Sequence, residues 1–426
     1  METTNNFKLN SFIITIDGKE IALSINQVIY MRYIEDIESA TKMMEVQITD
    51  SNSGLLSLMR GMERVYIEIE DNVGNQIGGI FTVYDIQDRV SEGTISKATI
   101  LLCTSDFINN AAIKVSRKFG DGQGKRIDKI VTEDILQGIL KTETELSADN
   151  IEPTFNKYSF VSPFWCPFTV ISWLASKSIP IEGSGASASA GYAFFENKFG
   201  YNFKSYDSFT KDPIVKTLIL GHEPKDTEEV DGENILAIDK MRVLSSSDVL
   251  KGLNIGSYNS NVMTVDLANM KYEETKFNIN KYYDTVPRLN KSPKPQYFEN
   301  FKKDTAATRI MSKIVDTALF SKGTHTAGLT KQLSQASLRE KLFYNKIVEV
   351  SYFGKFDLTV GNVVQLDIYQ GRSRGFDKAN SGKYVISKVD RTYYSNRDMM
   401  GTQLTLVTDS PGAVSYTHLR AHETRN

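Results

Sequence analysis

The same strand pattern occurs twice in the chain: in residues 65–104, VYIEIEDNVGNQIGGIFTVYDIQDRVSEGTISKATILLCT, and in residues 364–408, VQLDIYQGRSRGFDKANSGKYVISKVDRTYYSNRDMMGTQLTLVT. Each contains three segments in which apolar and polar residues alternate, a pattern typical of strands with one buried face. The copies match at an offset of 303 residues (382 − 79) and then 304 (404 − 100). The matched pairs are Gly79/Gly382, Phe81/Tyr384, Val83/Ile386, Ile86/Val389, Ile100/Leu404, Leu102/Leu406 and Thr104/Thr408. We therefore predict two related β units in one chain.

The inward-facing side chains of these strands are the candidate cores of two similar antiparallel β-barrels. They are Phe81, Val83, Ile100, Leu102, Leu366, Tyr384, Ile386, Leu404 and Leu406. Large apolar side chains on one face of a strand pack into a core, so we assign these residues a structural role.

Length and composition indicate a folded protein with several domains. Its 426 residues are too many for one hydrophobic core, and we expect roughly two to four domains. Charged residues make up 24% of the chain, the net charge is −2, and no dense Lys/Arg block occurs. Because phosphate recognition needs a concentrated positive surface, we expect no sequence-specific nucleic-acid binding.

The cysteines and the N-terminus indicate folding in a reducing cytoplasm. Of the two cysteines, Cys103 falls at a strand position that Val407 occupies in the other copy, as expected of a small buried hydrophobe. Residues 1–10 lack the apolar run of a signal peptide, and no stretch approaches the eighteen or so apolar residues of a membrane span. We expect no membrane anchoring.

The last residues, 414–426 (VSYTHLRAHETRN), resemble the translation of a sequencing-adapter read-through. The alternative is a natural disordered terminus, and we predict a disordered or artefactual tail over 411–426. His418 and His422 lie in this tail, and neither interpretation makes them ligands.

The predicted fold class is α+β, mainly β: two similar antiparallel, tube-like β-barrels with an inserted α/β domain and an inserted hairpin segment. The predicted regions are 1–104, first barrel; 105–212, α/β domain; 213–262, start of the second barrel; 263–340, inserted hairpin and helix; 341–410, second barrel; and 411–426, tail.

Shorter patterns predict individual elements. An Asp17-Gly18 turn indicates a hairpin, and apolar residues at helical spacing predict helices over 127–140 and from Pro167 onward. The aromatic-rich residues 192–206 and the polar residues 262–283 each predict a hairpin. Residues 214–220 fit a helix start or a strand. We expect 183–190 to be a flexible loop, 284–330 to be exposed, and 331–343 to be helical.

No catalytic constellation is evident. The segment FGDGQGKR (119–126) lacks phosphate-loop spacing, and Arg126 stands where a magnesium-binding hydroxyl residue is needed. His222 and His325 lie in polar, turn-rich contexts without a neighbouring ligand at metal spacing. No G-x-S-x-G elbow occurs. We expect no catalytic, cofactor-binding or metal-binding residues, no cofactor and no enzyme activity.

Four segments carry a family resemblance. They are residues 43–71, residues 159–207 (SFVSPFWCPFTVISWLASKSI and then AGYAFFENKFGYNFKSYD), residues 261–283, and residues 352–409 (YFGKFDLTVGNVVQLDI and then GKYVISKVDRTYYSNRDMMGTQLTLVTD). In order and spacing over 7–410, the chain resembles the baseplate hub proteins of T-even-like contractile-tailed bacteriophages. The motif G-x-F-x-L-x-x-G at 354–361 is only a β-turn signature, so the four segments together carry the match. Residues 183–190 and 287–321 match nothing in the family pattern.

The resemblance implies a non-enzymatic virion protein of the tail baseplate, assembled in the host cytoplasm. It implies a homotrimer with a ring of six barrels, between the hexameric tail tube protein and the trimeric cell-puncturing spike protein, with baseplate wedge or tube-initiator proteins as further partners. The duplication supports this independently, because a trimer can meet a six-fold tube when each chain supplies two near-equivalent surfaces.

Two alternatives stay open. The first is an enzymatic tail component, a cell-wall hydrolase or peptidase, which would need a catalytic domain that the sequence does not display. The second is the hub part of a type VI secretion-like spike, which normally continues into a long β-helix.

Overall fold

The computed structural model describes residues 6–51, 54–181, 191–221, 234–246, 250, 253–254, 259–266, 270–278, 287–290, 309–315, 336, 339–370, 375–377, 379–397 and 399–410. The loop predicted at 183–190, all four histidines and the tail predicted at 411–426 lie outside the described residues.

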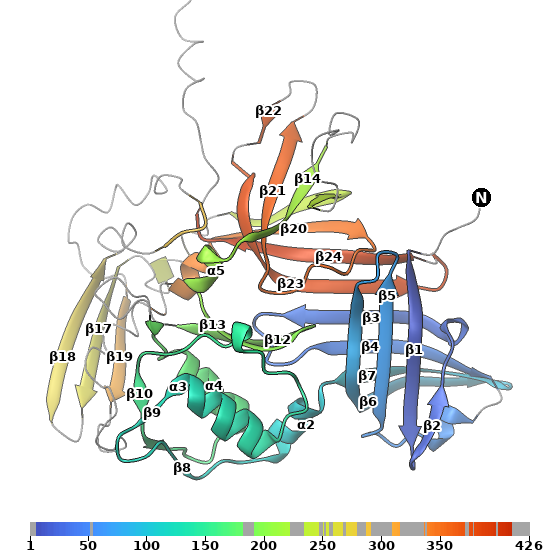
Figure 1. Cartoon of the computed structure of the whole chain (residues 1–426), viewed down its shortest axis with the longest axis horizontal. Helices are drawn as coiled ribbons and strands as arrows, with labels where there is room; N and C mark the ends of the chain where they lie inside the picture. Colours follow the sequence, from blue (N-terminus) through green and yellow to red (C-terminus); the bar gives the residue numbers. More distant parts are fainter. Residues whose placement is uncertain are drawn as a thin grey trace, which may run out of the picture.

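One curled sheet of 15 strands dominates the molecule (Figure 1). The first copy supplies β1 (Phe7–Ile16), β2 (Lys19–Ala22), β3 (Val28–Asp36), β4 (Met43–Ser51), β5 (Arg64–Asp71), β6 (Gln76–Glu92) and β7 (Ile95–Cys103). The second supplies β14 (Ile214–Leu220), β15 (Ile235–Ala237), β16 (Lys240–Ser246), β20 (Lys346–Phe353), β21 (Val363–Gln370), β22 (Gly375–Phe376), β23 (Gly382–Tyr394) and β24 (Met399–Thr408). The predicted turn at Asp17 and Gly18 joins β1 to β2, and both residues have positive φ, 47° and 77°.

Both copies arrange their strands in the same order. Neighbours run β2-β1-β5-β6-β7-β4-β3 in the first copy and β15-β14-β21-β23-β24-β20-β16 in the second. Chain order therefore makes β6 equivalent to β23, β7 to β24, β4 to β20 and β3 to β16, while β22 is an addition. The relation read from three sequence segments extends to seven strands.

The strand registers agree too. Equivalent pairs are Val65/Phe81 and Val364/Tyr384, Ile67/Gly79 and Leu366/Gly382, Ile86/Ile100 and Val389/Leu404, and Met44/Leu102 and Val348/Leu406. A β-bulge falls at the same place, at Tyr84 in β6 and Ser387 in β23. Gly79 and Gly382 both have positive φ, 123° and 145°, which a side chain disfavours.

One strand runs in opposite directions in the two copies, and one strand pairing joins the two copies into one sheet. β1 runs antiparallel to β5, whereas β14 runs parallel to β21. Residues 30–36 of β3 pair with residues 388–394 of β23, so the described strands of the two copies form a single sheet (Figure 1). The mainly β prediction is confirmed, while two separate barrel domains stay a prediction. Each copy nevertheless has its own main hydrophobic cluster, one around Phe81 and the other around Tyr384, and Phe356, Tyr393 and Met400 of the second copy pack into the first.

Residues 105–212 contain both predicted helices and the predicted aromatic hairpin. The helices are α2 (Ser105–Ala112), α3 (Ile127–Lys129) continuing into the π-helix η2 (Ile130–Leu140), the short 3-10 helix η3 (Ala148–Asn150), α4 (Pro167–Ala175) and α5 (Ser208–Lys211). The strands are β8 (Lys118–Phe119), β9 (Lys125–Arg126), β10 (Lys157–Tyr158), β11 (Phe160–Val161), β12 (Tyr192–Asn197) and β13 (Gly200–Ser205). A third hydrophobic cluster joins η2, α4 and the hairpin.

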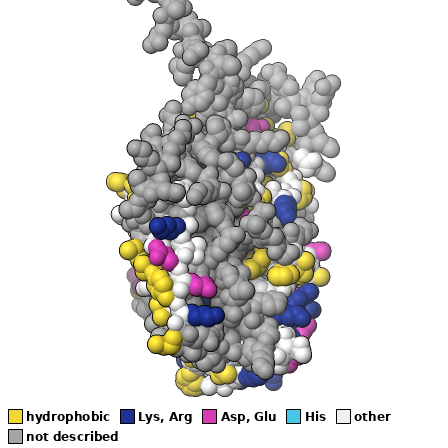
Figure 2. Space-filling model, turned by 90° about the vertical axis from the view of Figure 1, so that its left-hand side faces the viewer, with side chains coloured by type: hydrophobic (Ala, Val, Ile, Leu, Met, Phe, Trp, Pro, Cys, Tyr) yellow, Lys and Arg dark blue, Asp and Glu magenta, His cyan; other side chains and the backbone are white. Residues whose placement is uncertain are grey.

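A small separate sheet interrupts the second copy. The predicted hairpin is present as β17 (Asn259–Asp266) and β18 (Lys271–Asn278), and β19 (Arg309–Val315), which was not predicted, pairs parallel with β17. Figure 2 shows the face on this side of the molecule, where hydrophobic and charged side chains are intermixed. Residues 336 and 339–343 are helical, as expected for the end of the segment predicted at 331–343.

Candidate functional site

The features that stand out among the described residues are buried joints between elements and open sheet edges. They contain no group of three or more His, Cys, Asp or Glu side chains that could hold a metal ion. Over the same ranges, none of the helices is both long and apolar enough for a membrane crossing. The glycine-rich segment 119–126 runs from the end of β8 through a turn at 120–124 into β9. Its Arg126 Nη2 is 2.7 Å from Asp128 Oδ2, so its guanidinium is engaged within the fold.

A buried carboxylate lies at the joint between β3 and β23. Glu35 accepts hydrogen bonds from the Tyr33 hydroxyl at 2.7 Å and from the Val360 amide at 3.1 Å. The Thr359 hydroxyl donates a third. Thr359 and Val360 belong to loop 354–362, between β20 and β21, so these bonds tie the second copy to the first. Burial, reinforced by Glu35, raises the pKa of Tyr33 well above its usual value and keeps this phenol a neutral donor.

A buried arginine lies on the other side of the same joint. Arg391 of β23 donates from Nη2 to the Leu358 carbonyl at 2.5 Å. Its guanidinium lies 5.9 Å from the ring centroid of Tyr33 and 5.4 Å from that of Phe356. Because a planar guanidinium stacks well on aromatic faces, one side chain connects β23, β3 and the loop.

The aromatic hairpin reaches the same loop. Lys198, in the β12–β13 turn, donates to the carbonyl oxygens of Phe356 at 2.7 Å and Asp357 at 3.1 Å. Asn197 donates to the Val360 carbonyl at 3.1 Å, and the Phe356 amide donates to Asp71 of β5 at 2.8 Å. Burial lowers the pKa of Lys198 to about 8. The motif at 354–361, a weak signal in the sequence, is thus where both copies and the hairpin meet.

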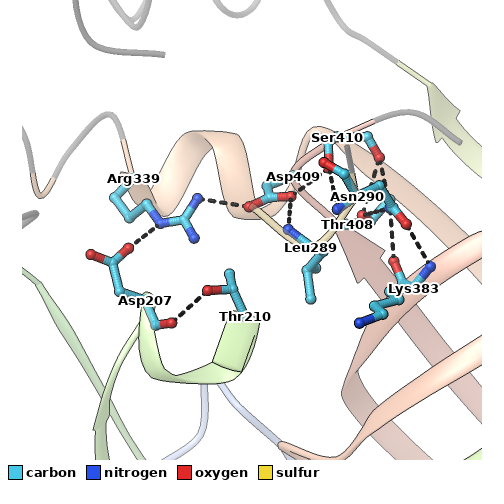
Figure 3. A network of polar contacts seen from close by, with 9 residues as sticks. All are labelled: Asp207, Thr210, Leu289, Asn290, Arg339, Lys383, Thr408, Asp409 and Ser410. Carbon is cyan, nitrogen blue, oxygen red and sulfur yellow. Dashed lines mark hydrogen bonds and ion pairs between the residues drawn. The ribbon is translucent and has the colours of Figure 1, made fainter. Parts of the chain in front are cut away.

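An ion triad holds the C-terminal end of the second copy, just after β24 (Figure 3). Arg339 is 1% exposed and donates from Nε to Asp207 at 2.7 Å and from Nη1 to Asp409 at 2.8 Å. Burial acts to lower the pKa of Arg339, but the two aspartates outweigh it and the net shift is upward. Since Asp207 adjoins α5 and Asp409 follows β24, the triad joins the inserted region to the end of the sheet.

Asn290 forms hydrogen bonds with the same end of the second copy (Figure 3). Its amide nitrogen Nδ2 donates to Lys383 O, Thr408 Oγ1 and Ser410 O, each at 3.2 Å, and its Oδ1 accepts from the Lys383 amide at 2.8 Å. Thr408 is equivalent to Thr104, whose hydroxyl donates to buried Glu196 at 2.7 Å. In both copies a threonine at or just after the end of the last strand therefore hydrogen-bonds to an inserted segment.

All nine candidate core residues are buried in the two hydrophobic clusters that pack against the sheet. Phe81, Val83, Ile100 and Leu102 lie in the first copy's cluster, and Leu366, Tyr384, Ile386, Leu404 and Leu406 in the second copy's cluster. Each is at most 1% exposed. They support the strands from within, and none lies at the joint itself.

Sequence reasoning missed the joint residues and one further repeat. Lys42, Glu45 and Val46 precede their equivalents Lys346, Glu349 and Val350 by 304 residues (346 − 42), the offset already found for β7 and β24. This signal could have been found from sequence. Glu35 and Arg391 gave no such signal, because a charged residue in an alternating strand is usually solvent-facing.

No protein-family model and no curated protein matches the chain. Its fold is similar to that of the tail protein from Neisseria meningitidis MC58, with a TM-score of 0.56 and 10% identity over 95% of this chain and 97% of that one. It is also similar to the 43 kDa tail protein of prophage MuSo2 from Shewanella oneidensis, with a TM-score of 0.55 and 10% identity over 94% and 98%. The predicted resemblance to tail proteins is therefore confirmed at the level of the fold.

Proposed function

We propose that this chain is the central hub of a contractile-tail baseplate. Three copies form a ring of six related β units between a hexameric tail tube and a trimeric cell-puncturing spike. The observation that carries this proposal is the duplication, which preserves strand order, register and a bulge in both copies. A threefold assembly of such chains presents six near-equivalent surfaces.

In this role the protein is structural. Its partners are further copies of itself, the tube protein, the spike protein, and wedge or tube-initiator proteins, and its location is the virion tail. Similarity of fold to two tail proteins supports this assignment. The buried joint around Glu35 and Arg391 suits a part that must hold two β units at a fixed angle under load.

Multi-angle light scattering on the full chain, alone and co-expressed with the spike protein, tests the proposal. We expect particles of three chains, and images down the particle axis should show six similar lobes. A protein that stays a single chain at high concentration with the spike present would contradict the hub assignment.

A further inference from the structure

The joint inside the chain is made by two particular strand edges. Along residues 382–385, one edge of β23 pairs with β21, and along 388–394 the same edge pairs with β3. The opposite edge pairs with β24 along residues 385–394. β3 in turn pairs with β4 on its other side.

The equivalent edges are both open. β5 covers β6 only as far as Thr82, and among the described strands residues 85–92 of β6 pair with β7 alone. β16, the equivalent of β3, pairs only with β20 within the described part of the chain. Each copy thus has one edge of each kind. Inside the chain, the edge of β3 pairs with the edge of β23, and the equivalent edges of β16 and β6 stay open.

We propose that the open edge of β6, residues 85–92, pairs antiparallel with the open edge of β16, residues 240–246, from a second copy of this chain. This inference rests on the proposed function and names the surface through which the hub assembles. The contact repeats the β3–β23 joint between chains. Since it is head to tail, it closes into a ring if its rotation permits and otherwise forms an open filament.

The register of this contact follows from the equivalences. Inside the chain, Arg32 lies opposite Thr392 and Tyr30 opposite Tyr394. Through their β4 and β20 partners, Arg32 corresponds to Arg242 and Tyr30 to Lys240. Through β7 and β24, Thr392 corresponds to Val90 and Tyr394 to Glu92. Val90 should therefore lie opposite Arg242, and Glu92 opposite Lys240.

The side chains on the two edges are complementary. Apolar groups are exposed on both, with Val90 51%, Val243 39% and Leu244 44% exposed. Val243 takes the place of Tyr33, which the internal joint buries completely. The β6 edge carries Asp85, Asp88 and Glu92 with one arginine, while the β16 edge carries Lys240 and Arg242 and no acidic residue. Opposite charges directly across a strand pair favour pairing, and like charges oppose it.

Cysteine cross-linking tests the contact. Directly opposed residues have Cβ atoms about 4.5–5.5 Å apart, close enough for oxidation to join them. In full chains carrying Cys166→Ser, we introduce Val90→Cys with Arg242→Cys and oxidise with copper phenanthroline. Linked species of up to three chains are expected on non-reducing gels. In separate single-cysteine proteins, a mixture of V90C and R242C should give two-chain species at least tenfold more efficiently than either protein alone.

A shifted pair controls for chance collisions. Ser246 lies at the far end of β16 from Lys240, so Val90→Cys with Ser246→Cys should cross-link at least tenfold less. Equal cross-linking of the two pairs, or none with Arg242, overturns the proposed contact.

The outcomes separate this inference from the proposed function. Three-chain particles by light scattering that resist cross-linking at Val90 and Arg242 would overturn the contact and leave the hub standing. A ladder extending well beyond three chains would support the contact and overturn the closed trimer.

Discussion

The second halves of β6 and β23 occupy the same place in two copies of one unit, yet one is exposed and the other buried. In β23, Val389, Arg391 and Tyr393 are buried beneath the contact with β3. In β6, Ile86 is partly buried and residues 87–92 are exposed. The bulge residues differ in the same way, since Ser387 is 5% exposed and Tyr84 is 43% exposed.

This difference shows that burial along a strand depends on its neighbour as much as on its own residues. The exposed edge carries charged side chains, which hinder indiscriminate pairing of open edges. Lys240 on the other open edge attracts acidic side chains, so the charges that hinder pairing with other strands favour pairing of the β6 edge with the β16 edge. Substitutions in the core, at the joint and in the loop behind it test how far the two strands differ.

The largest expected effect comes from the core that supports the joined strand. Ile386 and Leu406 face each other across β23 and β24 and are fully buried. Replacing both by Asp buries two unpaired charges, which should exceed the total stability of a domain, typically about 5–15 kcal/mol. Circular dichroism should show loss of the folded second copy.

Gln403→Asp is the matched control, because it places a charge on the same strand at an exposed position. It should change the stability by less than about 0.5 kcal/mol. Val83→Asp with Leu102→Asp, the same cross-strand pair in the first copy, should be as damaging as the change in the second. Wild-type stability of either double variant would show that the inward face is wrongly assigned.

A smaller but more specific effect is expected at the joint. Arg391→Ala removes the stacking on Tyr33 and Phe356 and leaves the buried Leu358 carbonyl without its donor. We expect a loss of about 2–4 kcal/mol in the free energy of unfolding. Arg89→Ala, in the exposed bulge that stands at the equivalent place in β6, should cost less than about 0.5 kcal/mol in dilute protein. Urea denaturation of both variants measures the difference, and equal losses would contradict the joined-versus-open comparison.

The sequence was sufficient for what depends on local pattern. Alternation located three strands in each copy, helical spacing located η2 and α4, and the Asp17-Gly18 turn located the hairpin of β1 and β2. The pairing of β3 with β23 could not be predicted, because it joins strands about 360 residues apart and alternation does not say which edge meets which. The reversal of β14 was hidden for the same reason. At the candidate site, the core residues could be recognised as apolar positions. Glu35 and Arg391 are charged residues of a kind that usually faces solvent, yet both are fully buried where β3, β23 and loop 354–362 meet.

The smallest expected effect is a pH dependence at the loop behind the joint. The pKa of Lys198 is about 8 in the folded chain, below its usual value of 10.5, because the ammonium group is buried against loop 354–362. Below pH 8 the lysine is charged in both folded and unfolded states, and the folded state bears the full cost of that burial. Between pH 8 and 10.5 the folded state releases its proton first, the unfolded state binds more protons, and stability rises with pH. Above 10.5 the effect is complete.

Lys198→Met removes this titration while keeping a side chain of similar length. Denaturation of the wild type and the variant from pH 7 to 10 should show the free energy of unfolding shifting in favour of the wild type as the pH rises past 8. A difference between the two proteins that stays constant over this range, or moves the other way, would mean that Lys198 is not held in the buried position between the hairpin and the loop. Because this lysine donates to the carbonyls beside Phe356, the same experiment reports whether the loop that receives Arg391 and Glu35 is packed as the joint requires.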